Sequence, residues 1–98
     1  RREISLDTIT QQVCLAYNIT IAQIVDKTRR QQIAYPRQIA MYLANLLIPQ
    51  LSLKEIAEYF KRKDHTTVLH AKKMIDNRFR EDINFRSHIE QLIKNIKA

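Results

Sequence analysis

Apolar residues recur at helical spacing in every periodic segment of this 98-residue chain. They fall three or four positions apart, which places them along one face of an α-helix. Alternating apolar and polar runs are absent, as are the turn dipeptides that close hairpins, so no strand is predicted. We therefore predict an all-α fold of about six helices, formed by residues 1–98 as a single domain.

Capping signals divide this periodicity into separate helices. Ser5 is a candidate N-cap of the first helix, and Asn18 is a plausible stop for it. Residues 20–23 form a Thr-x-x-Gln capping box, which opens a short helix. The last helix should follow a cap at Asp82 or Asn84, and the sequence leaves both open.

The central helix is predicted from a proline signal. Pro36 follows Tyr35, and a proline at the first helical position loses no needed hydrogen bond, so the helix should begin there. Pro49 should end it. The polar, basic residues 27–32 before it are predicted to be a loop, or a helix end running into a loop.

Two helix starts one short turn apart predict a helix-turn-helix. Ser52 and Glu55 form a capping box, and a second start lies at Asp64, directly after three basic residues. The second helix of such a motif presents its N-terminal turn to DNA, and here that turn carries short polar side chains. The residues predicted to face the core on the two helices are Leu53, Ile56, Ala57, Phe60, Val68, Leu69, Met74 and Ile75.

The charge balance points to a polyanionic partner. Lys and Arg number 17 against 10 Asp and Glu, which gives a net charge of +7. Nucleic acid and an acidic membrane surface both fit this charge. No apolar run approaches the roughly 20 residues that span a bilayer, and there is no signal-peptide pattern.

Other absences exclude classes of function. Without any glycine, neither a Walker-type phosphate loop nor a dinucleotide fingerprint can exist here. The single cysteine, Cys14, excludes an internal disulfide and a cysteine-based zinc site, which fits a reducing compartment. His65 and His70 are five apart, which is not the spacing of a helical metal pair. We find no nucleophile–base arrangement and predict no enzyme, no metal and no cofactor in this domain.

Two motifs resemble the DnaA family of bacterial chromosomal replication initiators. Residues 64–71 read Asp-His-Thr-Thr-Val-Leu-His-Ala, which is similar to that family's signature, and residues 35–41 resemble its Arg-Pro-Arg-Gln segment. The resemblance runs from about Ile4 to the C-terminus. It implies a Trp-repressor-like fold and the C-terminal DNA-binding domain of a longer initiator, with ATP or ADP held by an upstream domain. It also implies a cytoplasmic, nucleoid-associated bacterial protein.

The resemblance implies a set of contacts to double-stranded DNA at DnaA boxes of the replication origin. Base contacts are expected in the major groove from the start of the second helix and in the adjacent minor groove from the basic loop. The expected base-contacting residues are Arg29, Asp64, His65, Thr66 and Thr67. The expected phosphate-contacting residues are Lys27, Arg37, Gln38, Ser52, Leu53, Lys61, Arg62 and Lys63. Acidic phospholipid and regulatory proteins are further candidate partners, and the missing dimerisation seam favours a monomer.

Several residues have a second interpretation. Asp64 can cap its helix, accept a hydrogen bond from a cytosine amino group, or do both with its two oxygens. His70 is predicted to pack against the body of the fold. In the family that the chain resembles, the turn before Asp64 usually holds glycine, but here it reads Lys61, Arg62 and Lys63. A left-handed residue there would cost on the order of 1 kcal/mol. The alternative function is a basic helical adaptor for a protein partner or an acidic membrane surface, since the Leu/Ile-rich last helix carries Lys94 and Lys97.

Overall fold

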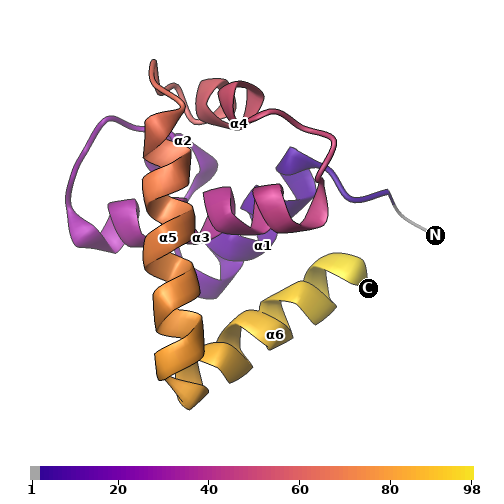
Figure 1. Ribbon diagram of the computed structural model, residues 1–98. Coiled ribbons are helices and arrows are strands. Elements are labelled where there is room, and N and C mark those ends of the chain that lie inside the picture. The colour runs from indigo at the N-terminus through magenta and orange to yellow at the C-terminus, as the bar shows by residue number, and fades with distance from the viewer. Residues whose placement is uncertain (1–2) are drawn as a thin grey trace.

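The computed structural model describes residues 3–98, and all regular elements in this part of the chain are helices (Figure 1). The predicted all-α class is confirmed, as is the predicted number of helices. In chain order the helices are α1 Leu6–Tyr17, α2 Ile21–Ile24, α3 Gln31–Leu47, α4 Leu53–Tyr59, α5 Thr66–Glu81 and α6 Ile83–Lys97. None of them is both long and apolar enough to traverse a bilayer.

The predicted N-caps form as hydrogen-bonded caps. The side chains of Ser5, Thr20, Ser52 and Asp82 each accept from a backbone N–H two or three residues later. The capping boxes at Thr20 and Ser52 are complete in both directions. Asn18 ends α1 in the left-handed conformation, with φ of 55°. Of the two candidates for the last cap, Asp82 is the residue that the structure selects.

The predicted start of α3 is wrong. The helix begins at Gln31, one turn before Pro36, and the loop ends at Arg30. The N–H groups of Ile33 and Ala34 donate to the Arg30 carbonyl at 2.9 and 2.7 Å, which closes the first turn ahead of the proline. Pro36 therefore lies inside the helix, where it has no N–H to donate to the Gln32 carbonyl. The first turn carries exposed glutamines, so apolar periodicity did not reveal it.

The core is built around α3, which packs mainly against α5 and α1. On α5 the buried face consists of Val68, Ala71 and Ile75. The prediction that Leu69 and Met74 face inward is wrong, since they are 45% and 41% exposed. A helix turns about 100° per residue, which rotates both side chains away from the face that Val68 and Ile75 define.

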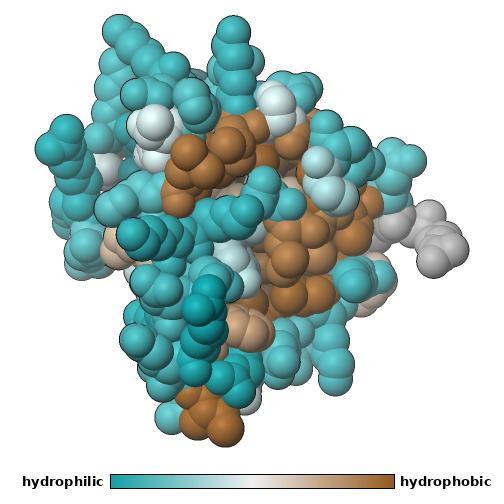
Figure 2. Space-filling view, viewed as in Figure 1, coloured by the Kyte–Doolittle hydropathy of each residue, from teal (hydrophilic) through white to brown (hydrophobic). Residues whose placement is uncertain are grey.

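The apolar face of α6 is covered by the same core. Phe85, Ile89, Leu92 and Ile96 are at most 5% exposed. This burial removes the feature that favoured the membrane adaptor, because the apolar side of the last helix is not open to lipid. Hydrophilic atoms cover the left of the face in Figure 2, over α5 and the loop beside it. Apolar atoms gather over α3 and between α3 and α6.

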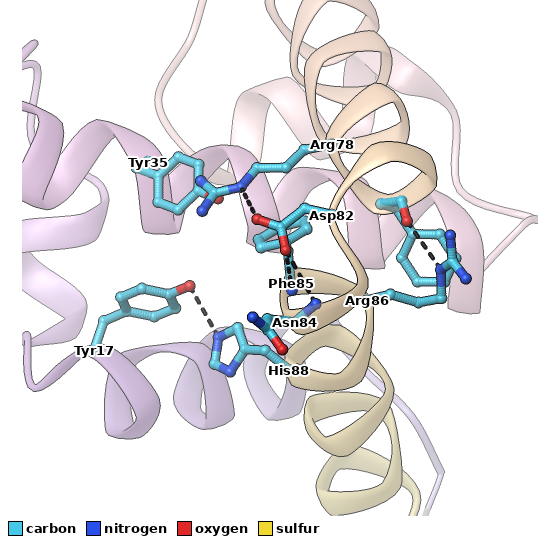
Figure 3. A network of polar contacts seen from close by, with 9 residues as sticks. Tyr17, Tyr35, Arg78, Asp82, Asn84, Phe85, Arg86 and His88 are labelled. Atoms are coloured by element: carbon cyan, nitrogen blue, oxygen red, sulfur yellow. Dashed lines mark hydrogen bonds and ion pairs between the residues drawn. The ribbon is translucent and has the colours of Figure 1, made fainter.

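A polar and aromatic cluster joins α1, α3, α5 and α6 near the C-terminal end of α5 (Figure 3). The Arg78 guanidinium carbon lies 4.5 Å from the ring centre of Phe85 and 5.2 Å from that of Tyr35. Arg78 also donates to the Tyr35 hydroxyl, and its Nε lies 3.7 Å from Asp82 Oδ2. These contacts hold the C-terminal part of α5, whereas the turn expected to read DNA lies at its other end.

Candidate nucleic-acid interface

The turn between α4 and α5 closes as a Schellman motif. The Arg62 N–H donates to the Ala57 carbonyl, and the Lys61 N–H donates to the Glu58 carbonyl, both at 2.9 Å. Lys61 occupies the left-handed position of this motif, with φ of 59°. The motif normally places glycine there, because a Cβ atom makes this conformation costly by about 1–2 kcal/mol. The left-handed residue considered for this turn without glycine is thus Lys61.

Asp64 caps the helix that follows. Its Oδ1 accepts from the Thr66 N–H at 3.0 Å, which satisfies one of the open donors of the first turn. The hydrogen bonds from Thr66 hold the pKa of this carboxyl below its usual range. His65 lies between this cap and the first residue of α5, and its Nδ1 lies 3.7 Å from Asp64 Oδ1. The capping interpretation of Asp64 is confirmed.

The residues expected to touch bases lie together at this exposed helix start. The side chains of Asp64 and His65 are 69% and 55% exposed, Thr66 is exposed, and Thr67 is half-buried. Each carries a hydrogen-bonding group on a short side chain. An α-helix fits the major groove of B-DNA, which is about 12 Å wide, so its first turn can approach base edges.

A hollow of about 480 Å³ connects this helix start to the basic loop. Arg29 lines it from the loop, Thr67 and His70 from α5, and Arg62 from the turn. The structure therefore brings Arg29 to the same concave surface as the start of α5, although the two are far apart in the sequence. The full lining is Thr28, Arg29, Gln31, Ala34, Arg37, Gln38, Met41, Arg62, Thr67 and His70.

His70 is placed differently from the prediction. It is exposed and lines the hollow instead of packing against the body of the fold. It lies about 200° around the helix from the buried Val68, so it faces away from the core. Its spacing of four from Thr66 and three from Thr67 is the signal that could have identified it, since such residues share a helix face.

Arg37 is also placed differently from the prediction. It was expected to hold phosphate, but only 6% of its surface is exposed and its guanidinium is bonded to the chain itself. Nε donates to the Ile24 carbonyl at 2.8 Å, Nη1 to Thr28 at 3.2 Å and Nη2 to Asp26 at 2.6 Å. Burial and the nearby Arg62 lower the pKa of Arg37 to about 10. The buried charge is accommodated because carbonyl oxygens satisfy it, not because it faces solvent.

The other residues expected to hold phosphate differ in their exposure and in the hydrogen bonds that they already make. Lys27, Lys61 and Lys63 are exposed on the loop and turn, whereas Leu53 is half-buried at the start of α4. Ser52 is exposed, but its N–H and hydroxyl both serve the capping box with Glu55. Arg62 donates to the Asp26 carbonyl at 2.7 Å.

Gln38 is half-buried in the hollow, and its amide is poorly satisfied. Its Nε2 lies 3.9 Å from Met74 Sδ, and Oε1 is buried without a partner among the residues described. Those same residues contain no group of three or more His, Cys, Asp or Glu side chains that could hold a metal ion.

Known proteins are similar to this chain in sequence and in fold. Residues 6–75 match the family described as the bacterial dnaA protein helix-turn-helix. A chromosomal replication initiator protein DnaA from Caldanaerobacter subterraneus subsp. tengcongensis is 48% identical over 97 residues, covering 99% of this chain and 21% of the relative. The same protein from Rickettsia canadensis is 41% identical over 93 residues, covering 95% of this chain and 20% of the relative.

A solved structure gives the same result for the fold. A crystal structure described as a DNA replication initiation factor superposes with a TM-score of 0.79 at 33% identity. The match covers 93% of this chain and 28% of that one. The chain spans about a fifth of the length of the two DnaA relatives described above. With the family model matching 70 consecutive positions and both relatives aligned over nearly the whole chain, this protein belongs to the bacterial DnaA family, to its helix-turn-helix region.

Proposed function

We propose that this chain binds double-stranded DNA sequence-specifically, reading DnaA boxes at the replication origin for an initiator. The observation that carries the proposal is the shared hollow of Arg29, Arg62 and Thr67 beside the exposed start of α5. It places a basic loop and a polar recognition turn on one surface, in a chain with a net charge of +7. Such a surface can contact two adjacent grooves of one duplex.

The major-groove contacts would come from the first turn of α5. Thr66 and Thr67 each offer a hydroxyl for hydrogen bonding and a methyl group that can meet the thymine methyl. Asp64 can keep its cap through Oδ1 and accept from a cytosine amino group through Oδ2. Its negative charge repels phosphate, so it contributes to discrimination between sequences more than to affinity. His65 adds a donor or acceptor at the same edge.

The minor-groove and backbone contacts would come from the basic residues. Arg29 would enter the minor groove next to the major-groove site, where narrow A/T-rich DNA has a strong negative potential. Lys27, Lys61, Lys63 and Arg62 would meet phosphates, together with Gln38, Ser52 and Leu53. The chain would bind an asymmetric site as a monomer. Any ATP or ADP would be held by an upstream domain of a longer protein.

The test is a fluorescence-anisotropy titration with a box duplex and a scrambled duplex at two salt concentrations. We expect Thr66→Ala to lose about 1–3 kcal/mol of discrimination at one base position. Lys63→Ala, the matched phosphate control, should weaken binding to all duplexes alike and reduce the salt slope by about 0.9. Equal wild-type affinity for the two duplexes would refute sequence-specific binding.

A further inference from the structure

Two arginines from different elements converge on one backbone oxygen. The Asp26 carbonyl accepts from Arg37 Nη2 at 2.6 Å and from Arg62 Nη2 at 2.7 Å. Arg37 belongs to α3, Arg62 belongs to the turn of the helix-turn-helix, and Asp26 lies just after α2. This oxygen is therefore a direct connection between the recognition motif and the start of the basic loop.

Arg37 holds the loop at more than this one point. Its three nitrogens reach the carbonyls of Ile24, Asp26 and Thr28, which are alternate residues of one segment. Thr28 immediately precedes Arg29, so the last of these bonds fixes the backbone from which Arg29 extends. A planar guanidinium can make three such bonds at once, whereas a lysine ammonium is a single point charge on a flexible stem.

Holding two guanidinium groups at one oxygen is electrostatically unfavourable. Neither Arg37 nor Arg62 forms an ion pair with a carboxylate within the described part of the chain. Arg37 is also almost fully buried, and burying a charge is costly unless hydrogen bonds satisfy it. An arrangement of this kind needs a compensating gain, and fixing the loop against the recognition turn would supply one.

We propose that Arg37 and Arg62 are positioning residues that set the distance between Arg29 and the first turn of α5. They would match the minor-groove reader to the major-groove readers on a single box. This inference rests on the proposed DNA-binding function. It predicts that Arg37 affects specificity through Arg29, and that it does so by geometry, not by charge.

The test is a double-mutant cycle with Arg37→Lys and Arg29→Ala, measured by anisotropy on two duplexes. The second duplex replaces the A·T pairs of the expected minor-groove contact by G·C pairs, which place an amino group in that groove. Each replaced pair typically costs wild-type protein roughly 5- to 150-fold in affinity. In Arg29→Ala this penalty should disappear, and in Arg37→Lys, which keeps the charge, it should fall at least threefold.

Two further readouts separate positioning from other roles. In the Arg29→Ala background, Arg37→Lys should change affinity less than twofold, while the Thr66-dependent base preference stays intact. Arg30→Gln is the matched control, because it removes a positive charge from the loop that carries Arg29. The Arg30 side chain donates only to Gln32, at 3.3 Å, and not to the backbone of that loop. This variant should leave the minor-groove penalty unchanged. Circular dichroism should show each variant to be folded.

The outcomes distinguish this inference from the function on which it rests. If wild-type protein binds box and scrambled duplexes equally, both fail. If the wild-type protein is specific but Arg37→Lys keeps the full minor-groove penalty, only the positioning role fails. The same holds if the affinity losses of Arg37→Lys and Arg29→Ala multiply in the double mutant. Should Arg37→Lys not fold, Arg62→Gln compared with Lys63→Gln gives the same test, because only Arg62 bonds the Asp26 carbonyl.

Discussion

Replacing Lys61 by glycine should stabilise the fold, because Lys61 is a non-glycine residue in the left-handed position of a Schellman motif. Its φ of 59° places Cβ against the backbone, at a cost of about 1–2 kcal/mol. Glycine removes that cost but adds about 0.4–1 kcal/mol of unfolded-state entropy. The net expectation is a gain of about 0.7 kcal/mol in the free energy of unfolding.

This gain is measurable by thermal and urea denaturation followed by circular dichroism. With an unfolding entropy of about 2.1 cal/mol/K per residue, the melting temperature should rise by about 3–4 °C. Lys61→Ala keeps Cβ and removes the charge, so it should change stability little. Lys63→Gly, two residues later and without positive φ, should lose about 0.5–1 kcal/mol.

Two results would refute this reasoning. If Lys61→Ala stabilised the protein as much as Lys61→Gly, the benefit would come from removing a positive charge and not from relieving the backbone. If Lys61→Gly destabilised the protein, the left-handed residue would not be strained. The same variant should make the salt dependence of DNA binding shallower by about 0.9, if Lys61 contacts a phosphate as proposed. Stability and affinity should thus move in opposite directions.

Three further outcomes test other parts of the structure. Arg78→Met should lower the free energy of unfolding in urea denaturation by about 1–2 kcal/mol, because it removes the stacking on Phe85 and the hydrogen bond to Tyr35. Breaking the exposed ion pair of Arg80 with Asp76 should cost less than about 1 kcal/mol in the same assay. Burial raises the pKa of Tyr17 to about 12 from 10, so stability present below pH 10 should be lost as pH rises toward 12. Tyr17→Phe should flatten this part of the denaturation profile. Burial also raises the pKa of the Cys14 thiol, so a thiol reagent at pH 8 should react far faster in urea than with folded protein.

Local signals in the sequence predicted most of the helix boundaries. Ser5, Thr20 and Ser52 were identified as caps because capping depends on residues only three positions apart, and the sequence shows such patterns directly. The start of α3 was missed because no capping residue marks it, since Arg30 makes no side-chain cap hydrogen bond there. Pro36 is an equally local signal, but here it lies inside the helix, and the exposed Gln31 and Gln32 at the true start carry no apolar pattern.

The role of Arg37 could not be predicted, because it depends on contacts that no local pattern encodes. Its carbonyl partners lie 9 to 13 positions earlier in the chain, and they come within reach only after α2 and α3 have packed. The phosphate contact of Arg37 was expected from the family resemblance, and a basic residue is normally solvated, so no local pattern opposed that expectation. The exposed lysines Lys27, Lys61 and Lys63 are side chains for which that default agrees with the observed exposure.

The placement of α5 explains how one helix can be a core element and also take the base-reading role proposed for it. Val68, Ala71 and Ile75 bury one face against the body, and Arg78 fixes the far end between two aromatic rings. Because these contacts hold the helix, the exposed segment of Asp64, His65 and Thr66 at its start projects from the body without packing of its own. Its short side chains then contribute little to stability apart from the Asp64 cap. Substitutions in the first turn should therefore change base preference, whereas substitutions at the far end should change stability and leave the ratio of box to scrambled affinity unaltered.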